Sequence, residues 1–373
     1  MRVFAVILFA VLRSFAADSA ADPKLLQRAK EIHKRIVAFD SHVDLPFDYA
    51  DAAADGKAQI DLPKVVRGQL KGAALAVFVP QGARTPEGYA QARTDAEKKY
   101  NLIKGIAEQH PDRAALGYSP ADVRRIAAQG KFAVVVSMLN AYPLDSDLSQ
   151  IDEWYKRGVR ILGFVHAGHN DWADSSRPNA GRGDRLEEHG GLSALGKQAV
   201  ARLNDLGVLI DVSQLSTPAF KQVLSLTKAP VAATHSGMKG IVDNSRNLSD
   251  EELELLKRNG GVVQIVAFSN YLRPAPAQTA PAVVPPATVA QLVDSIAYAV
   301  RKIGIDHVGI SSDFNHGGGV EGWQNEGECQ NVTVELLRRG YVERDIAKLW
   351  GGNFFRVWTA AQNGARGSQA RRQ

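Results

Sequence analysis

The sequence predicts a (βα)8 TIM barrel formed by a chain of 373 residues. Eight short runs rich in Val, Ile, Leu, Ala and Phe alternate with amphipathic stretches, which is the pattern of parallel strands covered by helices. The runs are apolar along their whole length, as expected of strands that are buried on both faces. The runner-up, a doubly wound open sheet, is less favoured because no G-x-G-x-x-G motif follows an early strand.

Each predicted strand is bounded by Gly, Pro or polar residues. These strands are Ile36–Asp44, Ala73–Pro80, Phe132–Leu139, Val159–His166, Val208–Gln214, Val231–Ser236, Val262–Phe268 and Val308–Phe314. The predicted helices carry apolar residues at helical spacing. They are Asp22–Arg35, Pro86–Gln109, Ser193–Leu206, Thr217–Thr227, Ser249–Asn259 and Thr288–Ile303. Ser249 and Glu252 have the spacing of a capping box.

The length of the chain does not require a second domain, because a barrel of this type needs about 250 residues before insertions. We expect one (βα)8 domain over residues 22–362 and a basic tail over residues 363–373. Two long segments, Gly168–Gly191 and Arg273–Pro286, have the composition of loops and are predicted as insertions at the mouth of the barrel. Long loops in a compact domain are often functional.

The first residues have the order of a secretory signal. Arg2 gives a basic start, Val3–Leu12 are all apolar, and small residues follow around Ala17. Residues 1–20 are therefore predicted to be a signal peptide, which implies a secreted or periplasmic protein. An apolar run of this length is too short for a permanent membrane span. The alternative is an ordinary N-terminus of a cytosolic protein.

The charge and cysteine content exclude some classes of site. Basic residues number 45 and acidic residues 40, but no basic block with interleaved aromatic residues occurs, so nucleic-acid binding has little support. The single cysteine, Cys329, rules out an intramolecular disulfide and a cysteine-based metal site. The oligomeric state stays open, with a homodimer as one alternative.

Metal-competent side chains stand at the ends of four predicted strands. His42 and Asp44 end the first strand, His166 the fourth, His235 the sixth and Asp313 the eighth. A lone buried histidine is more often a core residue than a ligand. Five such residues at the C-terminal ends of strands, where barrel enzymes carry their active sites, indicate a common site. His42 and Asp44 are two residues apart and so point the same way from a strand.

Imidazole and carboxylate groups suit Zn²⁺ or a similar divalent ion. Such an ion lowers the pKa of a bound water and polarises a carbonyl group. Asp313 is placed to take the proton of that water and pass it to a leaving amine. These roles together describe hydrolysis of an amide or an ester. His169 and His316 lie in predicted mouth-side loops, and their roles stay open.

The motifs that contain these residues resemble those of the membrane (renal) dipeptidase family, a branch of the metal-dependent amidohydrolases. The resemblance extends from about Val37 to Trp358. The matching stretches are FDSHVDLP, GVRILGFVHAGHNDWADSS, LGVLIDVSQLS, APVAATHSG, NSRNLSDEEL, GIDHVGISSDF and GGNFFRVW.

The resemblance implies a role for each matching residue. His42 and Asp44 match metal ligands of the first strand, and His235 matches a ligand of a second metal ion. Asp313 matches the acid that binds metal and handles the catalytic proton. His166 matches the histidine that contacts the substrate or the tetrahedral intermediate. Arg246 matches the arginine that receives the C-terminal carboxylate of a dipeptide, for which a guanidinium fork is well shaped.

Two positions depart from the family pattern. Leu139 stands where the family has a glutamate that bridges two metal ions, and Gln214 stands where it has a second histidine. We therefore expect one tightly bound Zn²⁺ per chain, held by His42, Asp44 and Asp313 with His235 as a further ligand. The first hypothesis is a dipeptidase, or a close amidohydrolase, acting on small peptide-like substrates. The alternative is a degenerate, non-catalytic relative that binds small molecules.

Overall fold

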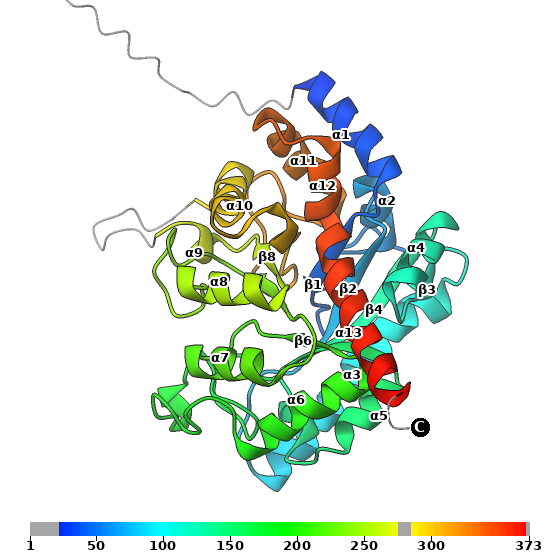
Figure 1. The fold of residues 1–373 in the computed structure, drawn as a ribbon. Helices are drawn as coiled ribbons and strands as arrows, with labels where there is room; N and C mark the ends of the chain where they lie inside the picture. The colour runs from blue at the N-terminus through cyan, green and yellow to red at the C-terminus, as the bar shows by residue number, and fades with distance from the viewer. Residues whose placement is uncertain (1–21, 275–284, 371–373) are drawn as a thin grey trace, which may run out of the picture.

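The computed structural model describes residues 22–274 and 285–370. Within these residues eight parallel strands form a barrel with helices around it (Figure 1). The strands follow one another around the barrel as β1 (Phe39–Val43), β2 (Gly72–Phe78), β4 (Phe132–Leu139), β5 (Val159–Gly163), β6 (Leu209–Asp211), β7 (Ala232–Ser236), β8 (Val262–Val266) and β9 (Val308–Ser311). The predicted fold is confirmed. The predicted signal peptide lies outside the described residues.

The barrel closes between its first and last strands. The backbone N–H of Asp44 donates to the carbonyl of Phe314 at 3.0 Å, and the N–H of Asp313 donates to the carbonyl of His42 at 3.2 Å. These bonds join the end of β1 to the chain just after β9. Closure therefore brings three of the predicted site residues side by side.

Helices precede and follow the strands, and most of them lie around the outside of the barrel (Figure 1). They are α1 (Pro23–Arg35), α2 (Leu62–Gly68), α3 (Pro86–Gln109), α4 (Pro120–Ala128), α5 (Gln150–Lys156), α6 (Ala194–Leu206), α7 (Thr217–Leu226), α8 (Asp250–Asn259), α9 (Ser269–Leu272), α10 (Val289–Ile303), α11 (Cys329–Arg338), α12 (Glu343–Ala347) and α13 (Asn353–Ala370). The capping box at Ser249 and Glu252 is present at the start of α8, as predicted. A short strand, β3 (Ala114–Leu116), pairs with β4 outside the barrel and was not predicted.

Helix α13 closes the N-terminal end of the barrel. Phe354, Phe355 and Trp358 are buried in one apolar cluster with residues from the first half of most barrel strands, such as Phe39 and Val262. Figure 1 shows this helix running across the strands. Since α13 fills the N-terminal end of the barrel, the open end lies at the C-terminal ends of the strands. The helix continues to Ala370, so most of the predicted basic tail is helical.

Candidate metal and substrate site

The predicted metal ligands converge at the open end of the barrel. His42 lies in β1 and Asp44 just beyond it, His235 lies in β7, and Asp313 follows β9 by two residues. All four side chains are buried, with at most 5% of any residue exposed. The sequence predicted Asp313 as part of the last strand. Instead, its backbone is left-handed, with φ of 58°, which turns the chain away from the strand.

Three of these residues offer ligand atoms that all lie within 4.8 Å of one another, namely His42, His235 and Asp313. The imidazole rings of His42 and His235 are stacked, with 3.9 Å between their centroids. His42 Nε2 lies 3.5 Å from Asp44 Oδ2 and 3.7 Å from Asp313 Oδ1. His235 is thus already beside His42, and the four predicted ligands form one group.

The donor atoms of this group suit a cation. His42 Nε2, both carboxylate oxygens of Asp44, and Asp313 Oδ1 are buried and have no hydrogen-bond partner among the described residues. Such atoms are costly to bury unpaired, and a divalent ion is the partner that two carboxylates and two imidazoles fit. Burial raises the pKa of Asp313 to about 7. Burial lowers the pKa of His235 well below its usual value, so its ring is neutral.

A chain of hydrogen bonds fixes the tautomer of His235. Asp211 Oδ2 accepts from the Thr234 hydroxyl at 2.6 Å, and the same hydroxyl oxygen lies 2.8 Å from His235 Nδ1. A carboxylate only accepts, so the single hydroxyl proton goes to Asp211, and Nδ1 must carry the hydrogen that Thr234 accepts. The Nε2 lone pair of His235 therefore faces the site.

Gln214 occupies that side of His235. Its Nε2 lies 3.1 Å from His235 Nε2, and its Oε1 accepts a hydrogen bond of 2.5 Å from Nη2 of Arg177. Because a guanidinium only donates, Arg177 fixes the orientation of the amide and directs its NH2 group towards His235. Gln214 also has a left-handed backbone, with φ of 70°. The neutral amide of Gln214 is thus held beside His235 by a hydrogen bond from the cationic side chain of Arg177.

Leu139 ends β4 in a small apolar cluster with Ala76 and Phe78. The Phe78 ring lies 4.5 Å from the ring of His166, between centroids. This wall of the site is therefore apolar where the family pattern has a carboxylate.

His166 and Arg246 line a small cavity next to the metal group. The cavity has a volume of about 60 Å³ and also includes Asp313, Gln214 and Arg177. Nη1 of Arg246 donates to Ser236 Oγ at 3.1 Å and Nη2 to the carbonyl of His235 at 2.5 Å, while its buried Nε has no partner among the described residues. The structure thus brings both predicted substrate-contacting residues to the metal group.

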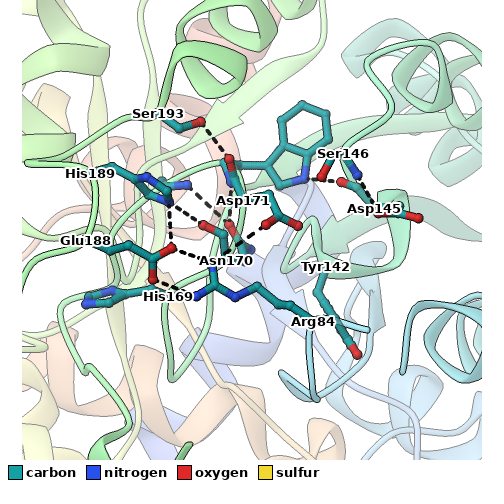
Figure 2. Close-up of polar contacts among 12 residues, drawn as sticks. Arg84, Tyr142, Asp145, Ser146, His169, Asn170, Asp171, Glu188, His189 and Ser193 are labelled. Atoms are coloured by element: carbon teal, nitrogen blue, oxygen red, sulfur yellow. Dashed lines mark hydrogen bonds and ion pairs between the residues drawn. The ribbon is translucent and has the colours of Figure 1, made fainter. Parts of the chain in front are cut away.

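The loop Gly168–Gly191 forms a dense polar network with neighbouring segments of the chain (Figure 2). Arg84 pairs with Glu188 at 2.6 Å, Trp172 Nε1 donates to the carbonyl of Asp145 at 2.8 Å, and Ser193 donates to the carbonyl of Asp171 at 2.6 Å. His169 belongs to this network and not to the metal group, since its Nδ1 accepts from the N–H of Ser175 at 2.9 Å and its Nε2 contacts the carbonyl of Arg185.

Sequence reasoning missed Arg177 and Tyr271, which line the inner cavity, and left the role of His316 open, which lines it too. Arg177 and His316 lie in loops at the mouth, and Tyr271 lies in α9, which is only one turn long. The loop composition of Gly168–Gly191 marked the right segment, but no pattern in it singled out one arginine.

The resemblance noted in the motifs is confirmed by comparison with known proteins. The family model described as "Membrane dipeptidase (Peptidase family M19)" matches residues 26–372. This chain belongs to the membrane dipeptidase family. Among curated members, Dipeptidase aclJ of Aspergillus oryzae is 30% identical over 315 residues, which cover 83% of this chain and 71% of the relative.

Solved structures of other proteins show the same fold. The probable dipeptidase PvdM from Pseudomonas aeruginosa is 46% identical, with a TM-score of 0.88 and coverage of 92% of this chain and 99% of that one. A metallopeptidase from Rhodobacter sphaeroides, crystallised with a phosphinate mimic of the dipeptide L-Ala-D-Ala, is similar in fold alone, at 21% identity, with a TM-score of 0.74 and coverage of 87% of this chain and 99% of that chain. In the part of the chain that the structure describes, no helix is long and apolar enough to cross a membrane.

Proposed function

We propose that this member of the family is a metal-dependent dipeptidase that works with a single Zn²⁺ ion. The observation that carries the proposal is the buried group of His42, His235 and Asp313 with Asp44 beside it, in which His42 and both carboxylates keep unpaired atoms among the described residues. Two anionic carboxylates balance the charge of one dication, and two neutral imidazoles complete the ligand set.

The surroundings of His235 support one ion and not two. Leu139 offers no donor atom, and the Gln214 amide is held by Arg177. A second dication at this position would have His235 as its only strong ligand and would face the guanidinium of Arg177. Three protein ligands are the usual minimum for a catalytic zinc ion.

When bound, the ion would lower the pKa of a water molecule and polarise the scissile carbonyl. Asp313 lies between the metal group and the substrate cavity, where it can hold the proton of that water and deliver it to the leaving amine. His166 lines the same cavity and would contact the carbonyl oxygen as it becomes anionic. Arg246 would receive the C-terminal carboxylate of the dipeptide.

The protein would act outside the cytoplasm. The order of Arg2, the apolar run Val3–Leu12 and the small residues around Ala17 supports export through a cleaved signal peptide.

A direct test combines metal analysis with a panel of dipeptides. Protein freed of metal with a chelator should be inactive, and Zn²⁺ should restore hydrolysis. No hydrolysis of any dipeptide by protein that has bound one equivalent of metal would contradict the proposal and favour a non-catalytic binding role.

A further inference from the structure

A larger cavity at the mouth of the barrel opens beside the small one and is lined by three arginines. It has a volume of about 690 Å³, and Arg177, Arg246 and Arg273 line it together with Phe268 and Tyr271. Arg177 and Arg246 also line the inner cavity that contains Asp313, whereas Arg273 lines only the outer one. The two cavities are therefore adjacent, with the inner one on the side of Asp313.

Positive charge predominates among the described residues that line the outer cavity. No acidic residue lines it among the described residues, and neither Arg177, Arg246 nor Arg273 forms an ion pair within the described part of the chain. Residues 275–284, which the structure does not describe, contain no Asp or Glu in the sequence. Guanidinium groups gathered in one concave site without carboxylates repel one another and attract an anion.

The cavity is built rather than accidental. Arg177 Nη1 lies 3.5 Å from the hydroxyl of Tyr271, and the Arg246 guanidinium lies 5.5 Å from the centre of the Tyr271 ring. Tyr271 thus contacts both guanidinium groups, and its ring stacks on Phe268 with 4.5 Å between centroids. The backbone of Arg177 is held as well, because its carbonyl accepts from the N–H of Gly168 at 2.8 Å and its N–H donates to Ser175 Oγ at 3.1 Å.

Two of these guanidinium groups keep an unpaired donor. Arg177 Nε is buried and has no hydrogen-bond partner among the described residues, and the same is true of Arg246 Nε. If Arg246 binds the C-terminal carboxylate, as the proposed function requires, Arg177 and Arg273 are left for a second anionic group. A planar guanidinium binds a carboxylate with paired hydrogen bonds.

We infer that the outer cavity is a second anion-binding subsite and that the preferred substrates are acidic dipeptides, which carry a side-chain carboxylate besides the C-terminal one. This inference rests on the proposed dipeptidase function. The aromatic wall of Phe268 and Tyr271 would pack against the apolar part of the acidic side chain while Arg177 and Arg273 bind its carboxylate.

The test measures hydrolysis by the metal-loaded protein of dipeptide pairs that differ only in side-chain charge. The pairs are Glu-Ala with Gln-Ala and Ala-Glu with Ala-Gln. For at least one pair we expect kcat/KM to be higher for the acid by about tenfold or more, the usual scale of one charge-assisted contact. The preference should fall as ionic strength rises. A ratio within about twofold of unity for both pairs would overturn the inference while leaving dipeptidase activity intact.

Substitutions locate the subsite. Arg273→Gln should bring the acid-to-amide ratio close to unity, and Arg273→Lys should keep part of it. Arg125→Gln is the matched control, because it removes the same charge from an exposed site on α4 that lines neither cavity. An unchanged ratio in Arg273→Gln would contradict the assignment. If no dipeptide is hydrolysed, calorimetry on the same intact pairs measures the binding preference directly, so failure of the dipeptidase function and failure of the subsite are distinguishable.

Discussion

Arg177 donates a hydrogen bond of 2.5 Å from Nη2 to Oε1 of Gln214, and this bond directs the Gln214 amide towards His235. A neutral amide and a cationic side chain thus stand beside His235, where the family pattern has a second histidine. The same guanidinium lies 3.4 Å from His166 Nε2 and lines both the inner and the outer cavity. One residue therefore connects the metal group, the substrate cavity and the outer cavity.

The number of metal ions should be one per chain after dialysis, as measured by elemental analysis. Two dications in a shared site lie about 3.5–4 Å apart and need an anion between them, and Leu139 supplies none. The double change Leu139→Glu with Gln214→His should move the value towards two, provided that the variant folds. Two tight equivalents in the unmodified protein would show that the ligand set described above is wrong.

Thr234→Val should weaken metal binding by about 10–100-fold, the usual effect of losing a residue that orients a ligand. Valine keeps the shape of threonine but cannot accept from His235 Nδ1, so the tautomer that presents Nε2 is no longer fixed. Competition with a chromophoric chelator measures the affinity. Thr234→Ser should restore it, and Thr94→Val on the exposed face of α3 is the control. Equal metal affinities in Thr234→Val and the unmodified protein would show that the hydrogen bonds from Asp211 through Thr234 do not orient His235 for the metal.

Asp313→Asn should reduce kcat by at least about 10²-fold, since removal of a general base commonly costs that much. Asparagine keeps the shape but loses the negative charge and the basic site. Loss of metal would have the same effect, so the metal content must be measured on the same sample. Full turnover with metal bound would exclude a proton-transfer role.

Arg246→Ala should raise KM for dipeptides and have much less effect on the corresponding C-terminal amides, which lack the carboxylate. The loss in transition-state binding should be about 2–5 kcal/mol, the usual cost of removing one partner from a buried, hydrogen-bonded charge pair. Steady-state kinetics on acid and amide pairs checks this. Equal losses on both would mean that Arg246 supports His235 and Ser236 structurally and does not anchor the carboxylate.

The mature protein isolated from its native host should begin between about Ala17 and Asp22, because small residues precede the first helix in the order that signal peptidases cleave. Intact-mass measurement decides this. A cytosolic protein that retains Met1 would contradict export.

Sequence pattern alone was enough to predict the barrel and the residues around its mouth. Short apolar runs alternating with amphipathic helices have few compact solutions, and the ends of parallel strands must meet at one edge. For that reason His42, Asp44, His235 and Asp313 could be grouped from their positions alone. The bounds of β4, Phe132–Leu139, were also predicted as the structure has them, because both sides of that strand are buried and the run is continuous.

Tertiary structure decided what periodicity does not encode. The bond between Arg177 and Gln214 joins residues 37 positions apart, and it depends on the path of a long loop that is fixed by side-chain hydrogen bonds rather than by an apolar repeat. Likewise, α13 fills the N-terminal end of the barrel because its Phe and Trp side chains pack against strands that are far apart in the sequence. Sequence pattern indicates which face of a helix or strand is buried. Only the folded chain shows which loops contact one another and which charged side chains then have no ion-pair partner.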